Sequence, residues 1–170
     1  MDVLFAFPAI LLALLLVALL GSNVRNLVIA ISIVYIPTFA RIARGSTMNV
    51  VAQPFVEASR SIGATDWRLI SRHIRPNIIA PLIVQFTVSL AFGILVEASL
   101  SFLGLGIQPP TPSLGNMLST GKTYLEISPW PALVPGTALC VTVLAFNLVG
   151  DGVRDLLDPR MRGEGLAGVR

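Results

Sequence analysis

The chain alternates between long stretches without charge and short segments that carry most of its charged residues. Four stretches contain no Asp, Glu, Lys or Arg, and they are 18, 15, 21 and 24 residues long. They are Val3–Leu20, Asn26–Ala40, Pro76–Val96 and Ile127–Gly150. Because a helix rises about 1.5 Å per residue, about 20 apolar residues cross the hydrocarbon core of a bilayer. The pattern therefore predicts an all-α polytopic bundle with four transmembrane spans, at about 3–20, 24–41, 77–96 and 131–149.

The composition favours the same class of protein. Of the 170 residues, 54% are hydrophobic and 12% are charged, and the mean hydropathy is +0.80. Because soluble domains carry about a quarter charged residues, this balance excludes a disordered chain, a nucleic-acid-binding domain and an ordinary cytosolic enzyme. With one cysteine and one histidine, the sequence offers no intrachain disulfide and no zinc or iron–sulfur spacing. We expect no cofactor, no metal, and a small buried hydrophobic residue at Cys140.

The basic residues are distributed unevenly between the connecting segments. Ten of the twelve lie within 41–76 or 150–170, whereas Arg25 and Lys122 lie in the other segments. The positive-inside rule therefore predicts a cytoplasmic loop at 41–76, an outer loop at 97–130 and a cytoplasmic tail at 150–170. Both termini are then cytoplasmic, and residues 1–170 form a single transmembrane domain.

The predicted cytoplasmic loop contains two short amphipathic patterns. In the first, Phe55, Ala58 and Ile62 share one helical face, and Gly63 then permits a left-handed turn. In the second, Thr65 or Asp66 is placed to cap a helix whose apolar face comprises Trp67, Ile70 and Ile74. Two such helices are expected to lie on the membrane surface or to dock on a cytoplasmic partner, and the pattern alone leaves both open.

Three sequence signatures, in order along the chain, resemble one family. The first comprises Glu57-Ala58-Ser59, Gly63 and His73-Ile74-Arg75-Pro76-Asn77. The second runs from Glu97 to Gly106, and the third comprises Asn147 to Asp151 with Leu157 to Arg160. The first signature resembles the EAA loop of bacterial ABC-importer permeases. The three signatures together are most similar to those of the dipeptide, oligopeptide and nickel (DppC/OppC-type) permeases, which have a MetI-like fold. Ser59 replaces the second alanine of the loop, and Arg75 replaces a leucine. The resemblance covers the whole chain, but the family's first two spans have no counterpart, so we expect a fragment or a truncated reading frame.

The resemblance implies a transport subunit rather than an enzyme. Two permease subunits would form the pore in the bacterial inner membrane, two separate cytoplasmic ATPases would hydrolyse ATP, and an extracytoplasmic solute-binding protein would deliver a dipeptide, an oligopeptide or a nickel chelate. The EAA loop would couple the ATPases to the pore. The residues expected to do so are Phe55, Glu57, Ala58, Ser59, Ile62, Gly63, His73 and Pro76.

Polar residues within or beside the spans are the candidates for the pore. Gln85, Ser89 and Asn147 lie inside spans, where hydrogen bonds between helices are one interpretation and pore lining is the other. Glu97 follows an uncharged stretch and so lies near the outer interface. It is expected either to form a structural pair or to act in gating and in contact with the amino terminus of a peptide.

Two functions of other classes are weighed against transport. One is a membrane scaffold or a truncated permease that no longer transports. The other is a membrane-anchored serine acyl enzyme, because Ser119-x-x-Lys122 matches the nucleophile motif of penicillin-binding proteins, although the companion motifs are absent. The stretch from Gly115 to Thr123 approaches a phosphate-binding loop, but five residues separate Gly115 from Gly121 where that loop has four.

Overall fold

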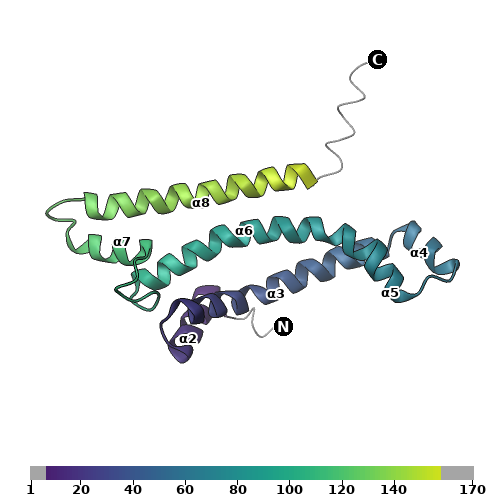
Figure 1. The fold of residues 1–170 in the computed structure, drawn as a ribbon, viewed down its shortest axis with the longest axis horizontal. Helices are drawn as coiled ribbons and strands as arrows, with labels where there is room; N and C mark the ends of the chain where they lie inside the picture. The colour runs from purple at the N-terminus through teal and green to yellow at the C-terminus, as the bar shows by residue number, and fades with distance from the viewer. Residues whose placement is uncertain (1–6, 158–170) are drawn as a thin grey trace, which may run out of the picture. The chain divides into compact units, whose positions relative to one another are not determined.

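The computed structural model describes residues 7–157, and every regular element within them is helical (Figure 1). In chain order the elements are α2 (Ala9–Leu20), α3 (Val24–Val51), α4 (Pro54–Ser61), α5 (Asp66–Leu69), the π-helix η1 (Ile70–Ile74), α6 (Arg75–Phe102), α7 (Leu114–Thr123) and α8 (Trp130–Leu157). The all-α fold predicted from the sequence is confirmed.

The chain divides into two compact units. The first unit comprises Met1–Pro37 and Val88–Asn147, and the second comprises Thr38–Thr87 and Leu148–Arg170. The helices α3, α6 and α8 contribute residues to both units.

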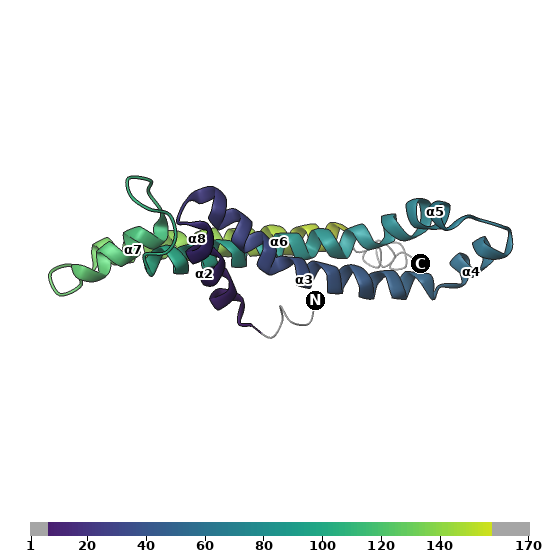
Figure 2. The ribbon, with the colours of Figure 1, turned by 90° about the horizontal axis from the view of Figure 1, so that it is seen from below.

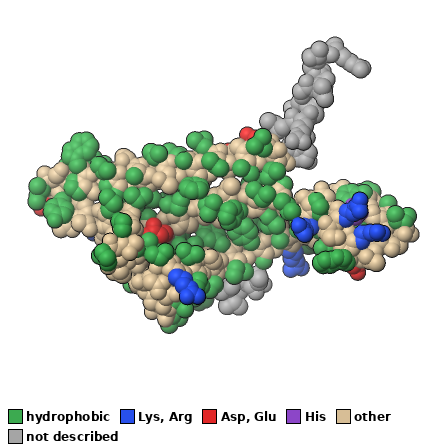
Figure 3. All heavy atoms as spheres, viewed as in Figure 1, with side chains coloured by type: hydrophobic (Ala, Val, Ile, Leu, Met, Phe, Trp, Pro, Cys, Tyr) green, Lys and Arg blue, Asp and Glu red, His purple; other side chains and the backbone are tan. Residues whose placement is uncertain are grey.

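Within residues 7–157, three helical segments are long and apolar enough to cross a membrane, namely Val24–Val51, Asp66–Phe102 and Trp130–Leu157. The helix α2 is also apolar but has 12 residues, and residues 3–6 of the first predicted span lie outside the described part of the chain. Most apolar side chains on the three long segments are not buried by the chain itself. Hydrophobic side chains accordingly cover much of the visible face of α6 and α8 (Figure 3), as lipid or another membrane subunit requires.

The helices continue beyond the predicted ends of the spans. The helix α3 extends to Val51, ten residues past the predicted end of the span. The predicted outer loop at 97–130 likewise contains the end of α6 and the whole of α7. A boundary drawn where charge begins therefore marks the edge of the apolar segment rather than the end of the helix.

The core of the first unit lies where α2, α3 and α6 meet. Its buried residues are Ala13, Val17, Leu27, Ala30, Val96 and Leu100, and Ile107 from the following loop packs against them. The two alanines let the helix backbones approach closely, as small residues do between membrane helices. Asn26 closes the connection between α2 and α3, because its side-chain amide donates to the carbonyl oxygens of Leu20 and Gly21.

The helix α7 is held in the first unit by two glycines that contact backbone directly. A Cβ added at Gly115 would overlap the carbonyl oxygen of Ala98 on α6, and one added at Gly121 would overlap that of Pro131 on α8. A Schellman motif fixes the start of the loop before α7, and Gly104 adopts a φ of +80° in it. The N–H of Gly104 donates to Ser101 O (3.0 Å), and the N–H of Leu105 donates to Leu100 O (2.9 Å).

Candidate coupling and pore residues

The helix α4 presents its predicted apolar face outward. Phe55 is 43% exposed and Ile62, just after the helix, is 87% exposed, whereas Val56 is buried. The face of Phe55, Ala58 and Ile62 is therefore available to a membrane surface or to a partner, which are the two alternatives that the sequence leaves open. Val56, which the periodicity did not single out, is the buried side chain of α4.

Gly63 ends α4 through a second Schellman motif. Its φ is +83°, its N–H donates to Arg60 O (2.9 Å), and Ala64 N–H donates to Ser59 O (3.1 Å). The left-handed turn predicted at Gly63 is confirmed. Ser59 donates its hydroxyl to Phe55 O (2.7 Å), so the serine that replaces an alanine satisfies its polar group within the helix.

The next segment begins as predicted and then departs from the expected register. The side chain of Thr65 caps α5 by accepting from Arg68 N–H (3.4 Å). Leu69 and Ile74 are buried, while Trp67 and Ile70 are exposed, so the predicted face of Trp67, Ile70 and Ile74 is wrong. The reason is η1, because a π-helical turn aligns residues five apart rather than three or four apart.

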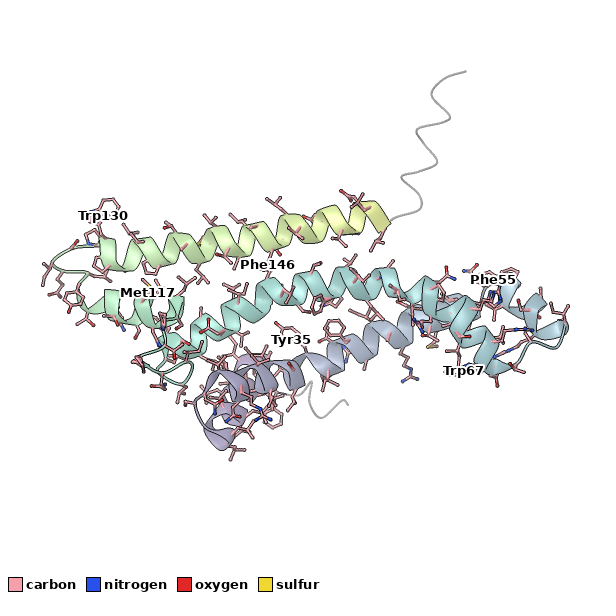
Figure 4. All side chains as sticks on the ribbon, viewed as in Figure 1. Tyr35, Phe55, Trp67, Met117, Trp130 and Phe146 are labelled. Carbon is pink, nitrogen blue, oxygen red and sulfur yellow. The ribbon has the colours of Figure 1, made fainter. Side chains whose placement is uncertain are left out.

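The helix α4 and the π-helix η1 contact each other through the rings of Phe55 and His73. The centroids of Phe55 and His73 are 5.9 Å apart, with the ring planes at 49°, and both residues were predicted for coupling. Asn77 then donates to His73 O (2.6 Å) one turn into α6. Figure 1 and Figure 2 both show α4 and α5 side by side beyond the end of α3, and Phe55 and Trp67 are labelled on this unit in Figure 4.

The remaining predicted coupling residues lie on the surface. Glu57, Ala58 and Pro76 are exposed, and Pro76 is the second residue of α6. Arg60 and Asp66 face each other across the Gly63 turn at 4.0 Å, but both are well exposed, so this ion pair adds little stability. Lys and Arg side chains are prominent on this part of the molecule in Figure 3.

The four predicted pore residues have different environments. Ser89 is buried and Gln85 is partly buried, and both have partners within the chain. Asn147 is exposed on α8. Cys140, on the same helix, is also exposed, so the expectation that it is buried is wrong.

Glu97 anchors a polar relay that the sequence did not reveal. Its carboxylate accepts from the hydroxyl of Ser101 (2.7 Å), and that hydroxyl accepts from Ile107 N–H (3.1 Å). Ser101 is 1% exposed, so the relay is largely withdrawn from water. Asn116 of α7 donates to Ile107 O and so joins the relay to the next helix. The spacing of four residues between Glu97 and Ser101 is the one signal in the sequence from which the pair could have been inferred.

Comparison with known proteins identifies the family. Residues 1–163 match the family described as "Binding-protein-dependent transport system inner membrane component". Two similar relatives are the glutathione transport system permease proteins GsiD of Escherichia coli O1:K1 / APEC and Shigella flexneri serotype 5b (strain 8401). Each is 51% identical over 162 residues, which are 95% of this chain and 54% of the relative, so the chain spans about half the length of the curated relatives it matches. The chain therefore belongs to the MetI-like inner-membrane permeases of binding-protein-dependent ABC importers, in the DppC/OppC-type branch.

Proposed function

We propose that this chain is a permease subunit of an ATP-driven importer of short peptides, with glutathione as the first substrate to test. The proposal is supported by the family match and by the glutathione transport named for its relatives. In this assignment the chain lines part of a pore with a second permease subunit. Two cytoplasmic ATPases supply the energy, and an extracytoplasmic solute-binding protein supplies the peptide.

The observation that carries the coupling proposal is the exposure of large apolar side chains around the Gly63 turn. Ile62 is 87% exposed and Trp67 is 78% exposed, on opposite sides of that turn. Leaving such side chains in water forfeits the free energy of burial, about 1.5–3 kcal/mol for each large apolar residue. An ATPase groove that accepts both residues would recover this free energy on docking.

The local geometry supports mechanical transmission from this surface to a span. The Schellman motif at Gly63 fixes the angle at which α4 ends, and the Phe55–His73 contact joins α4 to η1. The π-helix η1 ends at Ile74, and α6 begins at the next residue, Arg75, without a loop. A displacement of the docked helices is therefore passed directly to α6, which biases the pore between two conformations.

The test compares two exposed apolar positions in the assembled transporter. Ile62→Glu is expected to abolish ATP-dependent uptake and to reduce co-purification of the ATPases, because a carboxylate cannot enter an apolar groove without a large desolvation cost. Leu156→Glu, at a position 76% exposed near the end of α8, is the matched control and is expected to retain both. Normal uptake and ATPase binding by Ile62→Glu would assign the loop to the membrane surface instead.

A further inference from the structure

The first unit contains an apolar pocket between α6, α7 and α8 that no transport step described above uses. Its volume is about 310 Å³, and its main lining residues are Leu95, Phe102, Leu103, Leu118 and Leu139. Ser99 is the one polar residue of the lining, and its hydroxyl already donates to Leu95 O (2.7 Å) within α6. The pocket therefore suits an apolar chain rather than a polar solute.

The ammonium of Lys122 lies at the edge of this pocket. The ammonium of Lys122 lies 5.9 Å from the centroid of the Phe102 ring, which itself lines the pocket. Lys122 is exposed, and no carboxylate within residues 7–157 lies within 4.0 Å of its ammonium. The ammonium is thus held beside an apolar cavity with its donors available to an anion.

The aromatic residues nearby indicate how this site relates to the bilayer. Tyr124 directly follows α7, and Trp130 begins α8 (Figure 4), and both are exposed. Such residues concentrate at the level of the lipid headgroups. Leu139 lies nine residues after Trp130 on α8, hence about 14 Å deeper at 1.5 Å per residue. The pocket therefore reaches from a position near the headgroups into the hydrocarbon region.

We propose that this pocket binds one acyl chain of an anionic phospholipid whose phosphate pairs with Lys122. Lysine binds phosphate as a point charge, and a headgroup without a cation of its own, such as phosphatidylglycerol, leaves the whole negative charge for this pair. A zwitterionic lipid such as phosphatidylcholine carries a competing cation. The proposal requires only that these helices lie in a membrane, so it does not depend on the assignment of the coupling loop or of the substrate.

The experiment measures which lipids remain bound to the purified, assembled transporter by native mass spectrometry. The transporter is equilibrated in nanodiscs with equal amounts of phosphatidylglycerol and phosphatidylcholine, and the ratio of the retained lipids is compared between variants. Lys122→Gln is expected to lower the enrichment of phosphatidylglycerol about fivefold, the size of one lysine–anionic lipid interaction at a membrane surface. Lys122→Arg is expected to preserve the enrichment.

Two further variants separate this pocket from general surface charge. Arg25→Gln removes the exposed cation at the start of α3 and is expected to leave the enrichment unchanged. Leu139→Trp fills the pocket and is expected to reduce retention of both lipids. Unchanged enrichment of phosphatidylglycerol in Lys122→Gln would overturn the proposal. Retention of phosphatidylglycerol by the isolated subunit but not by the assembled transporter would also overturn it, because the partner permease would then occupy the pocket.

Discussion

Glycine serves two separable purposes at the residue scale. Gly63 and Gly104 have positive φ, and an added Cβ would meet no heavy atom within 4 Å, so these positions require glycine for its backbone conformation. Gly115 and Gly121 instead allow two backbones to touch, so these positions require glycine for its small size. The two purposes predict different consequences of substitution.

At Gly63 the cost of a side chain is conformational alone. Gly63→Val is expected to reduce peptide uptake and substrate-stimulated ATP hydrolysis in the assembled transporter, because a β-branched residue resists positive φ and redirects α5. Gly63→Asn is the control and is expected to retain most of both activities, since asparagine tolerates this region. Membrane abundance is expected to be normal for both variants, and uptake at the parental rate by Gly63→Val would argue against a coupling role for the turn.

At Gly115 the cost is steric. Gly115→Ala is expected to lower stability by about 1–3 kcal/mol, because the methyl group forces α7 away from the backbone of α6. Gly45→Ala in α3 is the matched comparison, because an added Cβ there has open space, and it is expected to raise stability by about 1 kcal/mol through helix propensity. Thermal unfolding of the purified protein measures both, and equal midpoints would contradict the packing described for α7.

At the scale of elements, the sequence predicted which short helices form but not which faces they bury. The residue types at Gly63 and Thr65 identified the turn and the cap, because each supplies a specific backbone interaction. Periodicity failed for the second short helix, because it assumes that a helix has 3.6 residues per turn. The π-turn at η1 violates that assumption.

The helix α7 was not predicted for a related reason. Its residues are mostly small or polar, so its apolar face is limited to Leu114, Met117 and Leu118. Its position depends on tertiary contacts of Gly115 and Gly121. The relay from Glu97 through Ser101 to Ile107 depends on how the loop folds back after Gly104. Features of this kind become visible only when the backbone path is known.

The π-turn itself makes a prediction about neighbouring residues. Leu69→Ala is expected to lower stability by about 2–5 kcal/mol, because it leaves a cavity at a buried position. Ile70→Ala, at the adjacent exposed position, is expected to change stability by less than about 1 kcal/mol. The midpoint of thermal unfolding distinguishes the two, and a larger loss in Ile70→Ala would show that the register of η1 is wrong.

At the scale of the whole molecule, the charge pattern predicted a membrane orientation that chemical labelling tests. In a Cys140→Ala background, Thr123→Cys is expected to react with a membrane-impermeant thiol reagent applied to intact cells. Ser71→Cys is expected to react only after the cells are permeabilised, because the charge pattern predicts that the arginine-rich loop is cytoplasmic. Both positions are exposed, so the reverse pattern would invert the orientation and remove the coupling assignment.

The family could be predicted from the order of three short sequence signatures, because each is tied to a particular place in the fold. The substrate could not be predicted in the same way, because the candidate pore residues have dissimilar surroundings. Ser89 is buried, Asn147 is exposed, and Glu97 is engaged by Ser101. Nothing in these environments specifies one peptide, and selection by a separate solute-binding protein is consistent with that.

We propose that this permease moves short peptides when partner ATPases act on its loop. The most direct test is the accumulation of labelled glutathione in proteoliposomes that contain the assembled transporter and its binding protein. We predict that the accumulation of glutathione requires ATP and is lost in Ile62→Glu. We also predict that an excess of other short peptides reduces this accumulation and that an excess of a nickel chelate does not. The absence of ATP-dependent accumulation of glutathione and of short peptides by the correctly assembled transporter would show that this permease does not import peptides.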